Sequence, residues 1–555
     1  MHDSQAGGSL RHVVLYAVVA ALAGFLFGFD TIVISGAEQQ IQTLWRLGGF
    51  LHGLSMSAAL WGTVLGALLG GWPAERFGRR QTLLWVGVLY FVSAIGSGLA
   101  PEMYTFIIAR FIGGLGVGIA TVASPMYISE IAPPKLRGIL AGLFQFNIVF
   151  GILVALVSNA VIKGLAEGVA PDSAGYLAGY FNEDSAWRWM LGIEALPALI
   201  YTLLCFVIPE SPRWLITHGG RREAGIEVFR RINPDMPDAD LRQLADSVEA
   251  SIGDRATAAR FFTWRLRVPI ALAFLIAMFN QLSGINAVFY FGPRLLGLAG
   301  MTDPLAAAVS LGLTNLVFTF VGLGLIDRLG RRMLLYIGSV GYILSLGICA
   351  FAFLSYPGFK VVSRAIDLEK SAEQVVGLTD MGPSLSEQTQ EKIRRDYAAA
   401  REALVEATTI EGYAGEPAAI PADAPPADVQ ARAAEIKAEA SSILGVKSYV
   451  VLISLIAFIA AHAIGQGTVI WVFISEIFPN RNRAAGQALG SSTHWVFAAM
   501  ITQVFPIAIA ALGAGGLFAF FCAMMCLQLI WVMFMVPETK GVPLEEMQAR
   551  LGITE

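Results

Sequence analysis

Two ionisable residues of opposite charge lie inside apolar stretches of this sequence. Asp30 is the one ionisable side chain in the run 24–37, and Arg110 lies within the apolar stretch 103–125. Charges in hydrocarbon are costly, so they usually face a bundle interior or a water path and pair with one another. We therefore expect Asp30 to pair with Arg110; the alternative is that Asp30 marks a helix end at the membrane surface. Withdrawal of Arg110 would favour protonation of Asp30, because the carboxylate would lose its neighbouring cation.

A third ionisable residue, Glu194, follows Trp187-Arg188-Trp189 in the apolar run 187–208. It is a candidate for a second titrating or gating group, and it could equally be a hydrogen-bonding link between helices. No Cys/His cluster has metal-ligand spacing, and all four cysteines lie in apolar runs. We therefore expect neither a metal nor another cofactor.

The composition places these residues in a membrane protein. Of the 555 residues, 55% are hydrophobic and 14% are charged, whereas a soluble domain has about 25% charged residues. A membrane-spanning helix needs ~20 apolar residues. We find runs of this kind at 13–36, 50–71, 81–98, 103–125, 139–162, 187–208, 268–292, 304–326, 333–355, 447–474, 485–510 and 516–536. The sequence therefore predicts an all-α membrane protein with twelve transmembrane helices, surrounded by lipid. It indicates neither nucleic-acid binding nor an enzyme.

Lysine and arginine residues are distributed unequally between the short loops of the two sides. One side carries the pairs Arg79-Arg80 and Arg331-Arg332, whereas the other carries few cations. Cytoplasmic loops carry the excess of such residues, so the Arg-rich side is predicted to be cytoplasmic, in a plasma membrane or a bacterial inner membrane. Both termini are expected on that side. The few cations of the other side are chiefly Arg46, Lys163 and Arg294.

Three motifs of the first half of the chain recur in the second half in the same order. They are Gly78-Arg79-Arg80 with Gly330-Arg331-Arg332, Ser129-Glu130-Ile131 with Ser475-Glu476-Ile477, and Pro209-Glu210-Ser211 with Pro537-Glu538-Thr539. Weak internal symmetry of this kind is typical of transporters, whose sites lie at the membrane midplane between two repeats. The repeat therefore predicts two six-helix halves with a central site.

The repeat also divides the chain. We expect a first half at 1–208, a cytoplasmic linker at 209–267 with helical patterns in 221–232, 238–253 and 256–265, a second half at 268–355 and 447–536, and a cytoplasmic tail at 537–555.

The second half contains an additional segment. The offset between equivalent motifs rises from 331 − 79 = 252 to 476 − 130 = 346 residues, which places extra residues at 356–446. This segment is polar, lies on the outer side between the ninth and tenth spans, and has helical patterns in 385–413 and 426–442. A passive insertion, a lid and a partner-binding module all remain open.

Charged residues at the helix ends of both repeats could form latches on the Arg-rich side. We expect Arg79 and Arg80 to pair with Glu130, with equivalent pairs in the second repeat. Such pairs would stabilise an outward-open state and separate in an inward-open one. The alternative is that the arginines only set topology, although the acidic partner in both repeats argues against it. The candidate latch residues are Glu75, Arg79, Arg80, Glu130, Arg137, Asp327, Arg331, Arg332, Glu476 and Arg483.

Seven motifs in register carry a resemblance to a known family. They are the run 24–37, Glu75 with Gly78-Arg79-Arg80, Arg110 with Gly114, Gly116 and Gly118, 125–138, Pro209-Glu210-Ser211-Pro212-Arg213-Trp214, Gln281 to Asn286, and 537–541. Outside 356–446 the chain resembles the sugar porters of the major facilitator superfamily. The resemblance implies the major facilitator fold and a monomeric monosaccharide transporter. Proton-coupled members of the family resemble this chain in carrying an aspartate at the position of Asp30, whereas facilitative relatives carry a neutral residue there. The resemblance therefore favours proton symport over a uniporter or a non-transporting sugar sensor.

A sugar offers hydroxyl groups and an apolar face, which amides and tryptophans match. Side chains of these types lie in the apolar runs at positions that resemble the family's sugar site, although a single amide could equally link two helices. The predicted sugar-binding residues are Gln145, Asn280, Gln281, Asn286, Asn315, Trp471 and Trp495. Tyr290 and Phe291 are predicted to form an outer gate, and packing in the core is the equal alternative. Ile152 and Asn280 depart from the family pattern, where glutamines are usual, so the sequence does not name the sugar.

Overall fold

The protein is all-helical throughout the residues that the computed structural model describes. These residues are 2–133, 136–169, 180–218, 221–250, 261–378, 386–421 and 423–553. Within them, ten helical stretches are long and apolar enough to cross a membrane. The fold is therefore that of a helical membrane protein.

The first half consists of long helices. They are α1 (His2–Leu44), α2 (Gly49–Leu69), the short α3 (Gly71–Phe77), α4 (Arg79–Gly98), α5 (Met103–Ile131) and α6 (Arg137–Glu167). The sixth predicted run is divided between α7 (Ala186–Gly192), which follows the 3-10 turn η1 (Glu183–Ser185), and α8 (Ala195–Leu204). The helix therefore breaks beside Glu194, one of the ionisable residues singled out by the sequence.

The second half has the same long helices, interrupted at glycines. It comprises α12 (Arg267–Leu282), α13 (Ile285–Tyr290), α14 (Gly292–Leu298), α15 (Pro304–Leu329), α16 (Arg331–Ser355), α21 (Val446–Ile464), α22 (Gln466–Ile477) and α23 (Arg483–Met535). Gly284, with φ 85°, separates α12 from α13, and Gly513, with φ 67°, interrupts α23. Glycine adopts positive φ without a steric penalty. The break at Gly513 explains why α23 contains two predicted spanning runs, 485–510 and 516–536.

The described part of the linker between the halves contains three helices and a short turn. They are α9 (Pro212–Thr217), α10 (Arg222–Ile232), α11 (Asp238–Ala250) and η3 (Trp264–Leu266). The helical patterns predicted at 221–232 and 238–253 are present as α10 and α11. Half of the third pattern, 256–260, lies outside the described residues, and 261–265 contains only the start of η3. A last helix, α24 (Leu544–Arg550), lies in the tail.

The additional segment folds as a small helical unit, called here the insert. It contains α17 (Pro357–Val376), α19 (Glu387–Thr408) and α20 (Pro426–Leu444), and α17 packs against the other two. The predicted helical portions correspond to α19 and α20, but the sequence analysis missed α17. Its apolar residues Val361, Ala365, Leu368 and Ala372 recur every three or four positions and are all buried, which is the pattern of an amphipathic helix.

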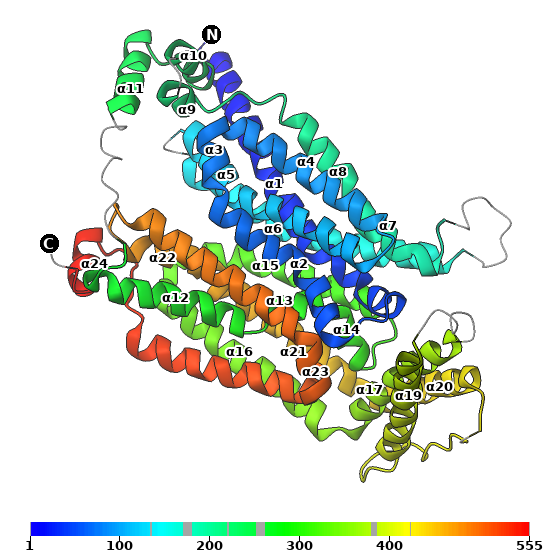
Figure 1. Ribbon diagram of the computed structural model, residues 1–555. Helices are drawn as coiled ribbons and strands as arrows, with labels where there is room; N and C mark the ends of the chain where they lie inside the picture. The colour runs from blue at the N-terminus through cyan, green and yellow to red at the C-terminus, as the bar shows by residue number, and fades with distance from the viewer. Residues whose placement is uncertain are drawn as a thin grey trace.

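The two halves lie side by side, with distinct ends (Figure 1). Contacts between the halves include α2 against α23 and α6 against α15. Both termini lie at the end that carries α9, α10, α11 and α24, called here the Arg-rich end because Arg79 and Arg331 begin α4 and α16 there. The insert lies at the opposite end, called the insert end (Figure 1).

Candidate transport site

Asp30 and Arg110 form a buried ion pair between α1 and α5. Nη1 of Arg110 lies 2.6 Å from Oδ1 of Asp30, and Nη2 donates to the main-chain oxygen of Asp30 at 2.7 Å. Asp30 is 0% and Arg110 1% exposed. Gly113 makes room for the pair, because a Cβ at that position would lie 3.3 Å from Oδ1 of Asp30 and only 2.4 Å from the Ser93 hydroxyl. The structure thus brings together the two ionisable residues that the sequence analysis paired.

Glu194 and Tyr290 lie next to this ion pair. Glu194, at the break between α7 and α8, is buried and within electrostatic range of Asp30 and Arg110. Tyr290 of α13, in the second half, lies within electrostatic range of the same pair. Among the described residues, neither the Glu194 carboxylate nor the Tyr290 hydroxyl has a hydrogen-bond partner, and Oδ2 of Asp30 also has none. The cluster therefore holds two carboxyl groups with oxygens free to carry a proton, and one side chain from the opposite half.

A cavity of about 770 Å³ lies between the two halves. It extends to Gly71, Thr121 and Ala484 near the Arg-rich end. Its lining includes every predicted sugar-binding residue, namely Gln145, Asn280, Gln281, Asn286, Asn315, Trp471 and Trp495. No Asp, Glu, Lys or Arg belongs to the described lining. Ligand pockets are typically of this size, mostly apolar with a few polar groups that fix orientation, and the missing charges suit a neutral polar solute.

Gln281 is the centre of the amide network in the cavity wall. Its Nε2 donates to Oδ1 of Asn280 at 2.9 Å, and its Oε1 accepts from Nδ2 of Asn286 at 2.6 Å. Nε2 also lies 3.1 Å from Nε2 of His494. Because Gly284 breaks the helix between Gln281 and Asn286, the two amides can face each other within five residues of chain.

The sequence analysis missed two histidines of the cavity wall. His494 lies between Trp471 and Trp495, with ring centroids 5.4 and 4.8 Å away. His462 also lines the cavity, and its Nδ1 is 2.8 Å from the Tyr342 hydroxyl. A lone histidine in an apolar span does not by itself indicate that it lines a cavity. For His494, the available signal was its position directly before Trp495, a predicted sugar-binding residue. Other polar lining residues that were missed are Thr31, Thr121, Thr319, Gln487, Ser491 and Ser492.

The halves meet between the cavity and the insert end. Phe291 stacks on Phe505 with centroids 4.1 Å apart, and its edge faces the ring of His52 in the first half. Nε1 of Trp61 donates to Oε1 of Gln503 at 2.8 Å across the same interface between the halves, called here the seam. Tyr290, 0% exposed, and Phe291 lie on the insert-end side of the sugar-binding amides. The predicted gate residues are therefore part of the closed end, and the cavity faces the Arg-rich end.

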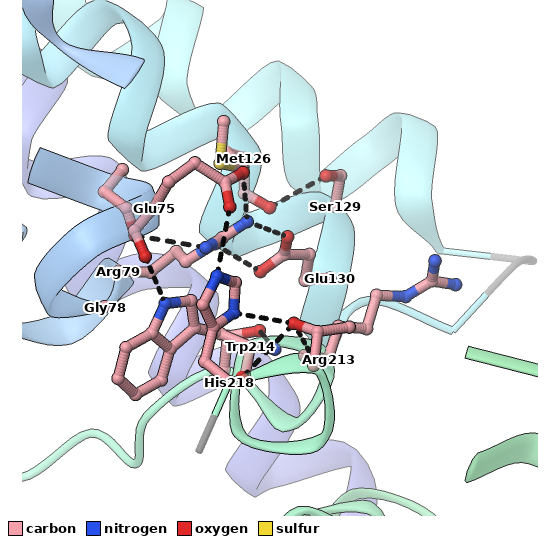
Figure 2. Close-up of polar contacts among 12 residues, drawn as sticks. Glu75, Gly78, Arg79, Met126, Ser129, Glu130, Arg213, Trp214 and His218 are labelled. Atoms are coloured by element: carbon pink, nitrogen blue, oxygen red, sulfur yellow. Dashed lines mark hydrogen bonds and ion pairs between the residues drawn. The ribbon is translucent and has the colours of Figure 1, made fainter. Parts of the chain in front are cut away.

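Arg79 is the centre of an ion network at the Arg-rich end of the first half (Figure 2). Its Nε and Nη2 each donate to Glu130 at 3.0 Å, and Nη2 also lies 3.1 Å from Glu75. Trp214 of α9 donates to the main-chain oxygen of Glu75 at 2.8 Å, and His218 stacks on Trp214. The network thus joins α3, α4 and α5 of the first half to α9 of the linker.

The second half repeats this arrangement around Arg331. Its Nε and Nη2 donate to Glu476 at 3.0 and 2.8 Å, and its Nη1 lies 3.2 Å from Asp327. The Thr539 hydroxyl donates to the same Glu476 carboxylate at 2.6 Å. Bidentate hydrogen bonds between an arginine and a carboxylate are the strong, orientation-specific form of this ion pair.

Other latch expectations need correction. Arg80 donates to the main-chain oxygens of Cys205 and Phe206 rather than to Glu130. Arg332 likewise donates to the main-chain oxygen of Met533. Both arginines lie in the first turn of a helix, beside the C-terminal end of another helix whose last carbonyls are free to accept. The sequence motif did not reveal this neighbour. Nε of Arg483 has no hydrogen-bond partner among the described residues, and the side chain of Arg137 lies outside them.

The expected separation of the latches in an inward-open state stays a prediction. The cavity faces the Arg-rich end, yet Arg79–Glu130 and Arg331–Glu476 are both formed. Each pair joins helices of the same half, so movement of one half against the other leaves both pairs intact.

Two glycines allow carboxylates to approach the first turns of α4 and α16. Gly78 has φ 101° and Gly330 has φ 91°. A Cβ there would lie 2.3 Å from Oε2 of Glu210 and 2.5 Å from Oε2 of Glu538, respectively. Each carboxylate accepts hydrogen bonds from the first two main-chain N–H groups of its helix, where negative charge is favoured. The third repeated motif therefore caps the helix that the first begins.

Two repeated helical halves around an uncharged central cavity are the architecture of a secondary transporter. The comparison with known proteins agrees. The family described as "Sugar (and other) transporter" matches residues 16–373 and 433–551, which leaves out most of the insert. The chain belongs to this family.

Relatives and solved structures give the same result. The glucose transport protein of Synechocystis is 30% identical over 546 residues, covering 98% of each chain. The arabinose–proton symporter of Bacillus subtilis is 28% identical, covering 97% of this chain and 95% of the relative. An inward-open structure of the xylose transporter from Escherichia coli matches with a TM-score of 0.68 at 27% identity, over 96% of this chain and 98% of that one.

Proposed function

We propose that this protein is a proton-coupled monosaccharide symporter with twelve transmembrane helices. The observation that supports this proposal most directly is the buried Asp30–Arg110 pair, together with an uncharged, amide-lined cavity. Membership of the sugar transporter family and likeness to a xylose transporter and an arabinose–proton symporter support the choice of substrates. The Arg-rich end and both termini are cytoplasmic, the insert is outside, and the chain works as a monomer in a plasma membrane or bacterial inner membrane.

Asp30 is the proton-carrying group in this proposal. Arg110 holds Oδ1, and Oδ2 is left without a partner in the described structure. When Arg110 releases the carboxylate, protonation of Asp30 replaces the lost cation and avoids a bare buried charge. Glu194 sits close enough to share that proton. Inward movement of one proton releases about 2.3 kcal/mol of free energy per 100 mV of membrane potential, and this free energy can drive sugar accumulation.

Coupling to the sugar runs through α13. Asn286 lies in the cavity wall and Tyr290 reaches the ion pair, and the two residues are one helical turn apart on this short helix. A sugar hydroxyl that binds Asn286 competes with its bond to Gln281 and so biases the position of α13. The displacement of Tyr290 then changes the surroundings of Asp30 and Arg110, which links sugar occupancy to proton binding.

The test is uptake of labelled pentoses and hexoses into proteoliposomes, with and without an inward proton gradient. We expect the native protein to concentrate at least one sugar when the gradient is present. Asp30→Asn should lose this concentration and retain exchange. Equal downhill flux in both proteins would identify a facilitator. Sugar binding without flux would identify a sensor, and absence of both would exclude a sugar as the substrate.

A further inference from the structure

A second buried ion cluster lies at the insert end, away from Asp30 and from the cavity. Its centre is Glu38 of α1, which is 1% exposed. Nη2 of Arg294 in α14 lies 2.6 Å from Oε1 of Glu38, and Nε of Arg294 donates to Oε2 at 3.1 Å. Nε2 of His52 in α2 lies 2.5 Å from the same carboxylate. Both oxygens of Glu38 are thus occupied.

The cluster joins three parts of the molecule. Glu38 and His52 belong to the first half, whereas Arg294 belongs to the second and also donates to Gln42 of α1. Lys370 of α17 brings the insert within electrostatic range of both Glu38 and Arg294. Glu38 is therefore the anion that Arg294 of the second half and Lys370 of the insert share.

We propose that Glu38 and Arg294 form a lock that holds the insert end closed while the cavity faces the Arg-rich end. The inference rests on the proposed function in that it assumes alternating access. Opening the insert end must carry Arg294 away from Glu38, because the two residues move with different halves. Removing one partner of a buried pair is strongly unfavourable, so the lock stabilises the closed end until water can reach Glu38.

His52 gives the lock a second part. Its Nε2 donates to Glu38, and its Nδ1 has no partner among the described residues. The imidazole moves with the first half, together with Glu38. It therefore keeps the carboxylate hydrogen-bonded after Arg294 has withdrawn, so the lock can open without leaving Glu38 bare.

The charges make the expected effects of substitution unequal. Glu38→Gln leaves Arg294 and Lys370 facing each other without their anion, and these two cations repel. Arg294→Gln leaves Glu38 with His52 and Lys370. We therefore expect Glu38→Gln to open the insert end more than Arg294→Gln does. The double variant should be less open than Glu38→Gln alone, because it also removes one of the repelling cations.

A distance measurement tests the lock without sugar or a proton gradient. Nitroxide labels on Leu165→Cys of α6 and Leu512→Cys of α23, both exposed, report the separation of the halves at the insert end. The background carries serine in place of the exposed Cys526 and the half-buried Cys522. Glu38→Gln should increase the long-distance population at least threefold, and Arg294→Gln by a smaller factor.

Lys163→Gln provides the matched control. Lys163 also reaches across the seam, to Asp303 at 3.7 Å, but the two side chains are 30% and 58% exposed, and ion pairs with this much exposure contribute little. It should leave the distances unchanged. The proposal is overturned if the Glu38 and Arg294 single variants match the native distances, or if their effects simply add in the double variant. Because no transport is measured, a failed lock stays distinct from a failed symport proposal, and size-exclusion profiles exclude misfolded variants.

Discussion

Arg110 binds Asp30 twice, once at the carboxylate and once at the main-chain oxygen. A planar guanidinium can make both contacts at once, whereas a lysine ammonium is a point charge without this geometry. Arg110→Lys keeps the charge but should lower gradient-driven sugar accumulation by on the order of tenfold, equivalent to about 1.4 kcal/mol. Proteoliposome uptake at fixed pH gradient is the measurement.

Arg188→Lys is the control for this change. Arg188 also donates to two main-chain oxygens, those of Gly98 and Ala100, but it has no carboxylate partner in the described structure. Accumulation should remain close to native in this variant. Native accumulation by Arg110→Lys would show that the two-point contact is dispensable.

Gln281 is expected to dominate sugar affinity among the cavity amides. Its replacement by leucine leaves Asn280 and Asn286 without their present partner and removes a group that faces the cavity. Loss of one partner in a buried hydrogen bond costs about 1–3 kcal/mol, which corresponds to roughly 5- to 150-fold in Kd. Equilibrium binding of labelled sugar measures the change. Gln528→Leu, at a buried amide that does not belong to the cavity lining, should retain native affinity; equal losses in both variants would point to general destabilisation.

Gly78 should tolerate no side chain. Gly78→Ala would place Cβ 2.3 Å from Oε2 of Glu210 and would force alanine to φ 101°. Strained backbone of this kind costs about 1–3 kcal/mol, so the apparent melting temperature in detergent should fall. The neighbouring Gly71 has nothing within 4 Å of its Cβ position, and Gly71→Ala should melt as the native protein does. A native melting curve for Gly78→Ala would mean that Glu210 moves aside at little cost.

The sequence predicted the parts of the fold that depend on motifs and on long apolar runs. Repeated Gly-Arg-Arg and Glu motifs identified Arg79–Glu130 and Arg331–Glu476 as pairs, because two copies of one pattern carry more information than one. The amides were predicted from positions that resemble the family's sugar site, and the structure brings them from four different helices to the wall of one cavity.

The remaining features depend on which helices meet, and a sequence does not state this. His494 enters the cavity because α23 packs against α12, and Arg294 finds Glu38 across the seam. Arg80 donates to main-chain carbonyls at the C-terminal end of α8 instead of to a carboxylate. Helix α17 was missed because it lies in a polar segment that contains no membrane-spanning run. The spacing of its apolar residues Val361, Ala365 and Leu368 was nevertheless visible in the sequence.

The pKa of Lys370 gives the insert end a dependence on pH. Burial and then the nearby Arg294 lower this pKa from 10.5 to about 8. If opening exposes the ammonium to water, the open form binds more protons between pH 8 and 10.5, so rising pH in that window favours the closed form. With the labels described above, the closed population of the native protein should increase from pH 8 upwards, and Lys370→Met should abolish the increase. Identical pH curves for the two proteins would contradict this assignment.

The duplicated networks around Arg79 and Arg331 have an evolutionary consequence. Each network ties together helices of its own half and includes the segment that follows that half, through Glu210 in one case and Glu538 in the other. A gene encoding one half would therefore already specify its own stabilising contacts. Joining two such genes would need only a linker such as 209–267, and an assembly of two identical halves would have the same internal contacts.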